Sequence, residues 1–406
     1  MEIEYIDNDE INGIKYDWKM IKREYRKLKI PKQYYNPCAA DPEKCGYVIA
    51  LSDRTHGKTT ETIILGMLMN KLYGTIIHYI RNAKDSITPY ALRDLFPVIQ
   101  ENGYIEKMTD GQYNGVWYFG HKWYYALYDE NGKRVETAPE HFMICMHLSE
   151  SGNRKSAYNC PRGDIIIFDE FIDVSGYGYS DFINFSDLVS TIFRKRQCPI
   201  IYMLSNTIDI NSPWFDELCL RDSIETIEHG ENRYIESPLG TVSFVQLLEP
   251  DKSEQAQTFI KRFFGFNNPK LAAITGRGKW ATEQYPHIPT NAERKEQEEQ
   301  EEPRILYSKV YIRQSGKLLR LQLMKTEIGL CVYVVPATQT YDDSIILTHE
   351  EIHARNEFFC FGPKNSKLQL FWRLYQGNRF YYKNNYDGAL FAAYVKAAKE
   401  KMKGMM

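Results

Sequence analysis

The chain has 406 residues, of which 43% are hydrophobic and 26% charged, a composition typical of a globular protein and not of a disordered one. Acidic and basic residues number 53 and 51, so the net charge indicates no particular partner. No apolar run reaches the ~18 residues that a membrane-spanning helix needs, and the acidic N-terminus is unlike a signal peptide. The eight cysteines form no CxxC pair. We therefore expect reduced thiols, no structural zinc and no membrane partner.

Residues 1–33 are expected to form a basic N-terminal arm. Eight basic and two acidic residues lie between Lys15 and Lys32, and Pro31 ends the helical pattern. This pattern predicts a helix whose charged face either is solvated or contacts a nucleic acid or another partner.

Residues 34–215 show the alternation of an α/β domain. Short apolar runs of strand length lie at 47–51, 75–82, 164–171 and 199–206, and segments of helical periodicity lie at 60–74 and 181–196. Strands that alternate with helices predict a mostly parallel sheet covered on both faces. The mixed, aromatic stretch from 102 to 146 is expected to be an inserted hairpin or a lid.

A loop from Ser52 to Thr59, SDRTHGKT, connects the first strand to the first helix. Its end matches the P-loop pattern GxxxxGK[ST], although Ser52 stands where the first glycine normally lies. Gly57 would let the backbone approach a phosphate, Lys58 would pair with the β- and γ-phosphates, and Thr59 would bind Mg²⁺. The loop therefore predicts ATP and Mg²⁺ as cofactors.

Two acids, Asp169 and Glu170, end the apolar strand DIIIFDEF. The carboxyl ends of parallel strands face the ligand crevice. Asp169 would hold Mg²⁺ through a water molecule, and Glu170 would activate the attacking water as a general base. The alternative is a buried strand that ends in two solvated acids. An acid pair downstream of a P-loop favours ATP hydrolysis over nucleotide binding alone.

Polar residues Ser205 and Asn206 end the strand at 199–206. A polar side chain at this position is suited to contact the γ-phosphate, whereas the alternative is a turn that simply ends the strand.

Two basic pairs are candidates for contacts between subunits. Arg194 and Arg196 end the helix at 181–196, where a basic residue either complements the helix dipole or projects into a neighbour's active site. Arg154 and Lys155 precede the acid strand and could reach the same interface or DNA.

The C-terminal part is expected to comprise a linker region, 216–303, and a further domain, 304–406. Six glutamates crowd the end of the linker, between Glu293 and Glu302. Three predicted strands follow, with Ser315 and Gly316 at one hairpin tip, and a basic helix spans 390–403. From Lys364 to the end there are nine basic and two acidic residues, which suits contact with phosphates.

These phrases together resemble the DNA-packaging ATPases of phi-twenty-nine-like phages, relatives of terminase large subunits and of the FtsK/HerA translocases. The resemblance rests on YNP at 35–37, the variant P-loop, YIR at 79–81, FDEFI at 168–172, TIFRKR at 191–196 and LSN at 204–206, with weaker support from YYKNNY at 381–386. It implies a P-loop ATPase of the ASCE class. It also implies a homo-oligomeric ring of five subunits, in the host cytoplasm and transiently at the portal vertex of a procapsid, that translocates double-stranded DNA.

The resemblance adds residues to the site. It implies that Tyr35, Arg54 and Thr60 join the nucleotide site. It also implies that Arg194, with Arg196 as second candidate, is an arginine finger, and that Lys155 acts across the subunit interface. The longer N-terminal arm and Ser52 depart from the family pattern.

Terminase relatives carry an RNase-H-like nuclease after the motor, and that chemistry needs a carboxylate on the first strand. The first predicted strand of the last domain, 305–314, has no acidic residue. We therefore expect a vestigial nuclease-like domain without nuclease activity. Its basic surface would contact the procapsid or the structured packaging RNA that some of these phages use.

Two other functions fit part of the pattern. A helicase or partition-type ATPase would show further motifs after residue 206, and the sequence has none that we find. A non-motor nucleic-acid-binding protein with a degenerate P-loop is disfavoured by the intact Lys58, Thr59, Asp169 and Glu170.

Overall fold

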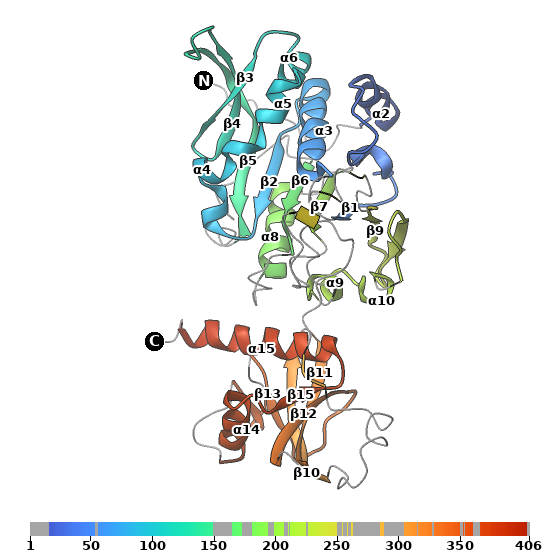
Figure 1. Cartoon of the computed structure of the whole chain (residues 1–406), viewed down its shortest axis with the longest axis vertical. Coiled ribbons are helices and arrows are strands. Elements are labelled where there is room, and N and C mark those ends of the chain that lie inside the picture. Colours follow the sequence, from blue (N-terminus) through green and yellow to red (C-terminus); the bar gives the residue numbers. More distant parts are fainter. Residues whose placement is uncertain are drawn as a thin grey trace, which may run out of the picture. The chain divides into compact units, whose positions relative to one another are not determined.

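A computed structural model describes two compact units of the chain (Figure 1). The first unit comprises residues 1–174, 180–208 and 218–281, and the second comprises 175–179, 209–217 and 282–406. The residues described are 16–52, 56–148, 165–172, 181–193, 199–206, 210, 212–224, 226–249, 254, 258, 261–262, 285–287, 304–314, 316–326, 329–349, 352, 354–359 and 366–403.

The first unit contains a nine-stranded sheet. Its strands are β1 (Tyr47–Ser52), β2 (Ile77–Arg81), β3 (Gly115–Phe119), β4 (Lys122–Tyr128), β5 (Arg134–His147), β6 (Ile165–Asp169), β7 (Ile200–Asn206), β8 (Asn232–Glu236) and β9 (Val242–Leu247). They are ordered β3-β4-β5-β2-β6-β7-β1-β9-β8, and neighbours from β5 to β9 are parallel. The predicted mostly parallel sheet is thus confirmed. Strand β7 lies between the P-loop strand β1 and the acid strand β6, which is the additional strand of the ASCE class.

Helices flank this sheet. They are α2 (Trp18–Lys27), α3 (Lys58–Tyr73), α4 (Pro89–Leu92), α5 (Pro97–Glu101), α6 (Tyr104–Met108), α8 (Asp181–Phe193) and α10 (Arg221–Ile224), with short 3₁₀ turns η1 (Pro37–Ala39), η2 (Lys84–Ile87) and η3 (Arg93–Leu95). Helix α3 is buried on nearly all sides from Thr62 to Met69, so it is the central helix of this layer. A Cβ on Gly66 would lie 2.6 Å from Ile77, so glycine lets α3 pack close to β2. Helices α2 and α6 both contact α3.

The inserted stretch from 102 to 146 is a hairpin that extends the sheet. Strands β3 and β4 form an antiparallel hairpin, β4 pairs with β5, and β5 runs parallel to β2. Aromatic rings pack on one face of this extension: the tilted pair Phe96 and Trp123 lies 4.6 Å apart, and the stacked pair Tyr125 and Phe142 lies 4.2 Å apart, between ring centroids. The hairpin prediction is therefore confirmed, and these strands are part of the main sheet, not a separate lid.

Part of the segment expected to be a linker also belongs to the first sheet. Strands β8 and β9 lie within residues 216–303, and β9 pairs in parallel with β1 along Tyr47–Leu51. Strand β9 is buried from Ser243 to Leu247, which explains this placement, because its side chains complete the core beside β1. Strands β8 and β9 therefore form an edge of the first sheet and are not part of a linker.

The second unit has a six-stranded sheet and two long helices. Its elements are α9 (Trp214–Glu217), β10 (Arg304–Gln314), β11 (Lys317–Thr326), β12 (Gly329–Ala337), β13 (Ile345–Leu347), β14 (Glu357–Phe358), α14 (Ser366–Gln376), β15 (Phe380–Tyr382) and α15 (Asn385–Lys403). The strand order is β14-β13-β10-β11-β12-β15, and the three predicted strands are the antiparallel β10, β11 and β12. Apolar side chains of β10–β12 pack with those of α14 and α15 in one core. No helix in the described part of the chain has the length and apolar character to cross a membrane.

Candidate nucleotide-binding and hydrolysis site

The polar ends of β1, β7, β6 and β2 lie side by side at one edge of the first sheet. The register pairs Ser52 of β1 with Asn206 of β7, Asp169 of β6 with Leu204 of β7, and Ile80 of β2 with Phe168 of β6. The carboxyl ends of four strands therefore meet at one place, and α/β sheets bind their ligands outside these carboxyl ends.

The N-terminus of α3 lies beside these strand ends and is suited to bind an anion. Gly57 is the N-cap, with a left-handed φ of 66°, and no side chain caps the helix. The first N–H groups of a helix lack intrahelical partners, and the helix dipole favours a negative charge there. An uncapped 16-residue helix that begins with a left-handed glycine therefore fits a phosphate group.

Lys58 reaches the ends of β1 and β7. Its ammonium donates to the Ser52 hydroxyl and, at 3.5 Å, to Oδ1 of Asn206. Its side chain is buried, and so is Ser52. The serine that replaces the usual glycine thus supplies an oxygen to the lysine. Asn206 therefore lies beside Lys58, and its contact with the γ-phosphate stays a prediction.

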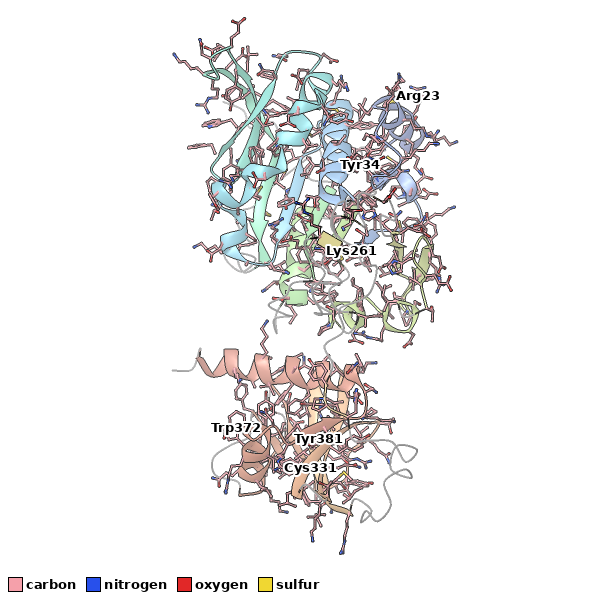
Figure 2. All side chains as sticks on the ribbon, viewed as in Figure 1. Arg23, Tyr34, Lys261, Cys331, Trp372 and Tyr381 are labelled. Carbon is pink, nitrogen blue, oxygen red and sulfur yellow. The ribbon has the colours of Figure 1, made fainter. Side chains whose placement is uncertain are left out.

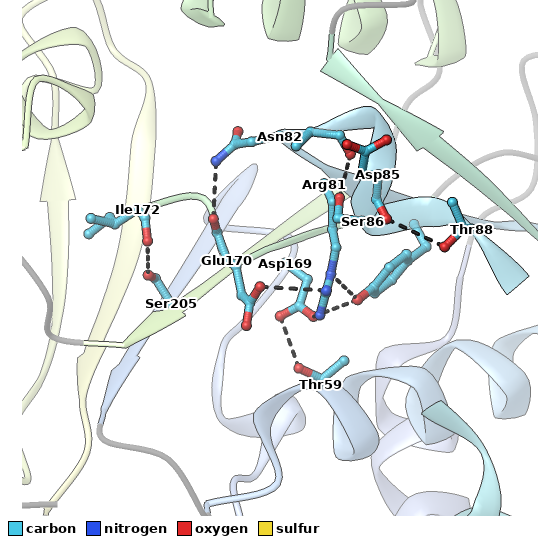
Figure 3. Close-up of polar contacts among 12 residues, drawn as sticks. Thr59, Arg81, Asn82, Asp85, Ser86, Thr88, Asp169, Glu170, Ile172 and Ser205 are labelled. Atoms are coloured by element: carbon cyan, nitrogen blue, oxygen red, sulfur yellow. Dashed lines mark hydrogen bonds and ion pairs between the residues drawn. The ribbon is translucent and has the colours of Figure 1, made fainter. Parts of the chain in front are cut away.

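Ser205 takes no part in this edge. Its side chain is buried, and its hydroxyl donates to the carbonyl oxygen of Ile172 at 3.3 Å (Figure 3). It ties β7 to the segment that follows β6, so Asn206 is the polar residue of this pair that lies at the site.

Thr59 and Asp169 form the pair suited to hold Mg²⁺. The Thr59 hydroxyl donates to Oδ1 of Asp169 at 2.9 Å, between α3 and β6 (Figure 3). A hydroxyl and a carboxylate are the oxygen ligands that Mg²⁺ prefers, and they fit the ion that accompanies ATP. Within the described residues, no group of three or more metal-ligating side chains is present, so such an ion would depend on the phosphates and water for its other ligands.

Asp169 is also held from β2. Its Oδ2 accepts hydrogen bonds from the Tyr79 hydroxyl at 2.6 Å and from Arg81 at 3.0 Å (Figure 3). Burial raises the pKa of Tyr79, and the negative charge of Asp169 raises it further, so the phenol stays a donor. Burial would lower the pKa of Arg81, but the negative charges of Asp169 and Glu170 raise it overall. The buried carboxylate is therefore fully paired.

Glu170 has an unusual backbone. Its φ is +55°, a left-handed conformation that side chains other than glycine seldom adopt. The amide of Asn82 donates to the carbonyl oxygens of Glu170 and Phe171, at 3.1 and 3.3 Å, and stabilises this turn. The Glu170 carboxylate is half-exposed and lies 3.5 Å from Arg81. Such strained residues concentrate at functional sites.

Tyr34, not Tyr35, has its ring beside the loop. The Tyr35 side chain is buried in the core, and its N–H donates to the carbonyl oxygen of His56 at 2.8 Å. Tyr34 is 40% exposed, and a Cβ on Gly57 would lie 3.4 Å from its ring (Figure 2). The nucleotide-binding role of Tyr35 stays a prediction from the resemblance, and the core position of its ring disfavours direct contact.

A buried acid lies behind the loop. Glu61, in the first turn of α3, accepts a hydrogen bond from the Tyr25 hydroxyl of α2 at 2.9 Å. Burial raises the pKa of Glu61 to about 7, although the bond from Tyr25 lowers it. The charge of this residue is thus set by its packing against α2.

The remaining predicted site residues are not all described. Thr60 lies in the first turn of α3, partly buried. Arg54, Arg154, Lys155, Arg194, Arg196 and Ser315 lie outside the described residues. Sequence reasoning missed Tyr34, Arg81 and Asn82 as site residues. Arg81 and Asn82 follow an apolar strand just as Asp169 and Glu170 do, and this signal could have identified them.

The fold and the site define a P-loop ATPase fold of the ASCE class. Comparison with solved structures identifies proteins that share this fold. The Phi-28 gp11 DNA packaging motor matches with a TM-score of 0.58 and 16% identity, over 91% of this chain and 99% of that one. The bacteriophage Phi-29 viral genome packaging motor assembly matches with a TM-score of 0.53 and 14% identity, over 92% of this chain and all of that one.

No family model and no curated protein matches the sequence. The chain therefore has the fold of phage DNA packaging motors over nearly its whole length, and the fold-level part of the resemblance is confirmed.

Proposed function

We propose that this protein is an ATP-driven translocase that packages double-stranded viral DNA into a procapsid. The observation that carries the proposal is the joining of Lys58, Thr59, Asp169 and Glu170 at one sheet edge, with Thr59 and Asp169 2.9 Å apart. The match to two DNA packaging motors supports DNA translocation as the process that ATP hydrolysis would drive.

Each residue would have a defined task. Lys58 and the N-terminus of α3 would bind the phosphates, and Thr59 and Asp169 would hold Mg²⁺. Bound Mg²⁺ would neutralise charge that develops on the transferred phosphoryl group. Glu170 would take a proton from the attacking water, and Arg81 would orient its carboxylate.

The ring is part of the same proposal. Arg194, with Arg196 as alternative, would act as a finger on the neighbour's nucleotide, and Lys155 would act at the same interface. The partners would be DNA, further copies of the chain, the portal of the procapsid and a structured packaging RNA. The strand order β12-β11-β10-β13-β14 in the second unit supports an RNase-H-like origin, and β10 has no acidic residue.

The test is DNA-dependent ATP turnover by the assembled protein. Glu170→Gln should bind ATP but hydrolyse it at least ~10²-fold more slowly, because only activation of the water is lost. Glu101→Gln is the matched control, since Glu101 is an exposed acid at the end of α5. Turnover that duplex DNA does not change would contradict a motor, and unchanged turnover in Glu170→Gln would contradict the assigned base.

Mixing of subunits tests the ring. Arg194→Ala should lower turnover by ~10³-fold if it serves as a finger. Mixed with Glu170→Gln subunits, it should regain part of the activity, because an intact finger can then meet an intact base. No recovery at any mixing ratio would contradict action in trans.

A further inference from the structure

We infer that the exposed face of α2 is a binding surface for the phosphate backbone of double-stranded DNA, separate from the site described above. The inference rests on the proposed function only for the choice of DNA as the partner. The surface is formed by the exposed Lys19, Arg23 and Arg26 and the partly exposed Lys22 of α2, and by the exposed Lys29 just after the helix.

The cations form continuous rows along the helix. Lys19, Arg23 and Arg26 follow each other at spacings of four and three residues, and Lys22 precedes Arg26 by four, so these cations lie along one side of α2, whereas Lys29 follows the end of the helix with a φ of +55°. The opposite side is buried, because Trp18, Ile21 and Tyr25 belong to the core. The charged side therefore faces solvent, with Arg23 labelled on it in Figure 2.

Most of this charge has no ion-pair partner among the residues that the structure describes. Glu24 forms ion pairs with Arg23 and Lys27. Within the part of the chain that the structure describes, Lys19, Lys22 and Arg26 form no ion pair or hydrogen bond through their side chains. These three cations are available to an external anion.

Helix stability does not explain the pattern. The cations Arg26 and Lys27, in the last turn, complement the helix dipole, but Lys19 lies in the first turn, where a positive charge is unfavourable. The first turn has no acidic residue, and like charges such as Lys22 and Arg26 at i,i+4 destabilise an isolated helix. An anionic ligand would offset these terms.

The helix is held in place despite its charge. The Asp17 side chain caps its N-terminus by accepting from the N–H of Met20 at 3.0 Å. The Tyr16 hydroxyl bonds to Thr75 at 3.1 Å, and Tyr25 bonds to Glu61 at 2.9 Å. The first unit therefore presents the rows of cations on a fixed helix, and Figure 1 shows that α2 lies beside α3. Fixed cations without base-reading geometry suit contact with phosphates and no sequence preference.

The experiment measures binding of the full-length protein to a fluorescent random-sequence duplex DNA, without nucleotide, over a series of salt concentrations. The variant is Lys19→Gln with Arg26→Gln, and the matched control, also losing two charges from the first unit, is Lys122→Gln with Lys133→Gln. The α2 variant should bind ~10- to 100-fold more weakly, and the slope of log K against log salt should fall by about 2. The control should bind as the wild type does.

Wild-type affinity and slope in the α2 variant would overturn the inference, as would equal losses in the control. A loss confined to duplex RNA, tested in parallel, would also overturn it. ATP turnover is measured on the same samples with and without duplex DNA. A loss of DNA binding in a protein that never hydrolyses ATP would refute the proposed function and retain this inference. Intact DNA binding by the α2 variant, together with normal ATP turnover by the wild type, would refute this inference and retain the proposed function.

Discussion

The two sheets of this protein hold their acidic side chains in different ways. In the first unit, Asp169 accepts from Thr59, Tyr79 and Arg81, which come from two neighbouring elements at one sheet edge. In the second unit, the acids are separate, and Glu357 is paired with Arg313 at 2.9 Å. The start of helix α3 and the end of strand β2 thus meet at one carboxylate, an arrangement that an ordinary structural ion pair such as Arg313–Glu357 does not need.

The second unit has acids whose settings differ from one another. Asp343 is exposed and bound to Lys309 at 2.6 Å, whereas Asp387 is buried near the start of α15. Burial raises the pKa of Asp387 to about 6. Within the described residues of this unit, no three side chains of His, Cys, Asp or Glu come together as a metal site would require.

The largest effect that tests this comparison is expected at Lys58. Lys58→Ala removes the charge that the phosphates would meet, so ATP binding and turnover should both fall to background. Lys133→Ala, an exposed lysine in the β4–β5 turn, should behave as the wild type does. Equilibrium binding of a fluorescent ATP analogue and steady-state turnover check this. Normal nucleotide binding by Lys58→Ala would contradict a phosphate site at the first sheet.

A smaller effect is expected at Arg81, which sharpens the comparison because it separates positioning from binding. Arg81→Gln should lower kcat by ~10- to 100-fold with a smaller change in KM, since Asp169 and Glu170 lose their common cation. Arg81→Lys should recover part of the rate. Assays at temperatures well below the measured Tm of each variant exclude unfolding as the cause, and an unchanged kcat would count against the positioning role.

Glu61 tests the pH dependence of the first unit. Its pKa rises from 4.5 in the unfolded chain to about 7 in the folded one. Between these values the folded state holds more protons than the unfolded state, so stability falls as pH rises. The carboxylate should cost on the order of 1–3 kcal/mol above pH ~7, and nothing below its unfolded pKa.

Glu61→Gln should therefore stabilise the protein at about pH 8 and change its stability little at about pH 4, while keeping an acceptor for Tyr25. Urea unfolding at both pH values measures the difference, with Glu101→Gln as control. An equal effect at both pH values would show that packing, not charge, is responsible.

The last prediction is that the protein does not cleave DNA. Supplied with Mg²⁺ or Mn²⁺, the full-length protein should leave supercoiled plasmid intact, because β10 carries no acidic residue. Gel electrophoresis checks this. Nicking that persists after repeated purification, and that disappears in Asp387→Asn, would assign to the second unit the chemistry that we place only in the first.

The sequence predicted those features that depend on local pattern. The P-loop, the acid pair and the three antiparallel strands of the second unit are each readable within a few residues. Arg81 was missed as a site residue because its role depends on strand order, which brings β2 beside β6. Tyr34 and Tyr35 show the same limit, since the two tyrosines are adjacent in the sequence and the local backbone conformation decides which ring is buried. The left-handed turn at Glu170 has no signal in the sequence, because glutamate does not favour it.

That turn also has an evolutionary consequence. A left-handed backbone costs a non-glycine residue roughly 1 kcal/mol, so glycine or asparagine would be the more stable residue at position 170. If Glu170 is the base that we propose, glutamate would persist there only while selection for hydrolysis outweighs this cost. In a descendant lineage that stopped hydrolysing ATP, we expect position 170 to drift to glycine or asparagine earlier than the buried, fully paired Asp169. The identity of this one residue would then distinguish working motors from inactive relatives.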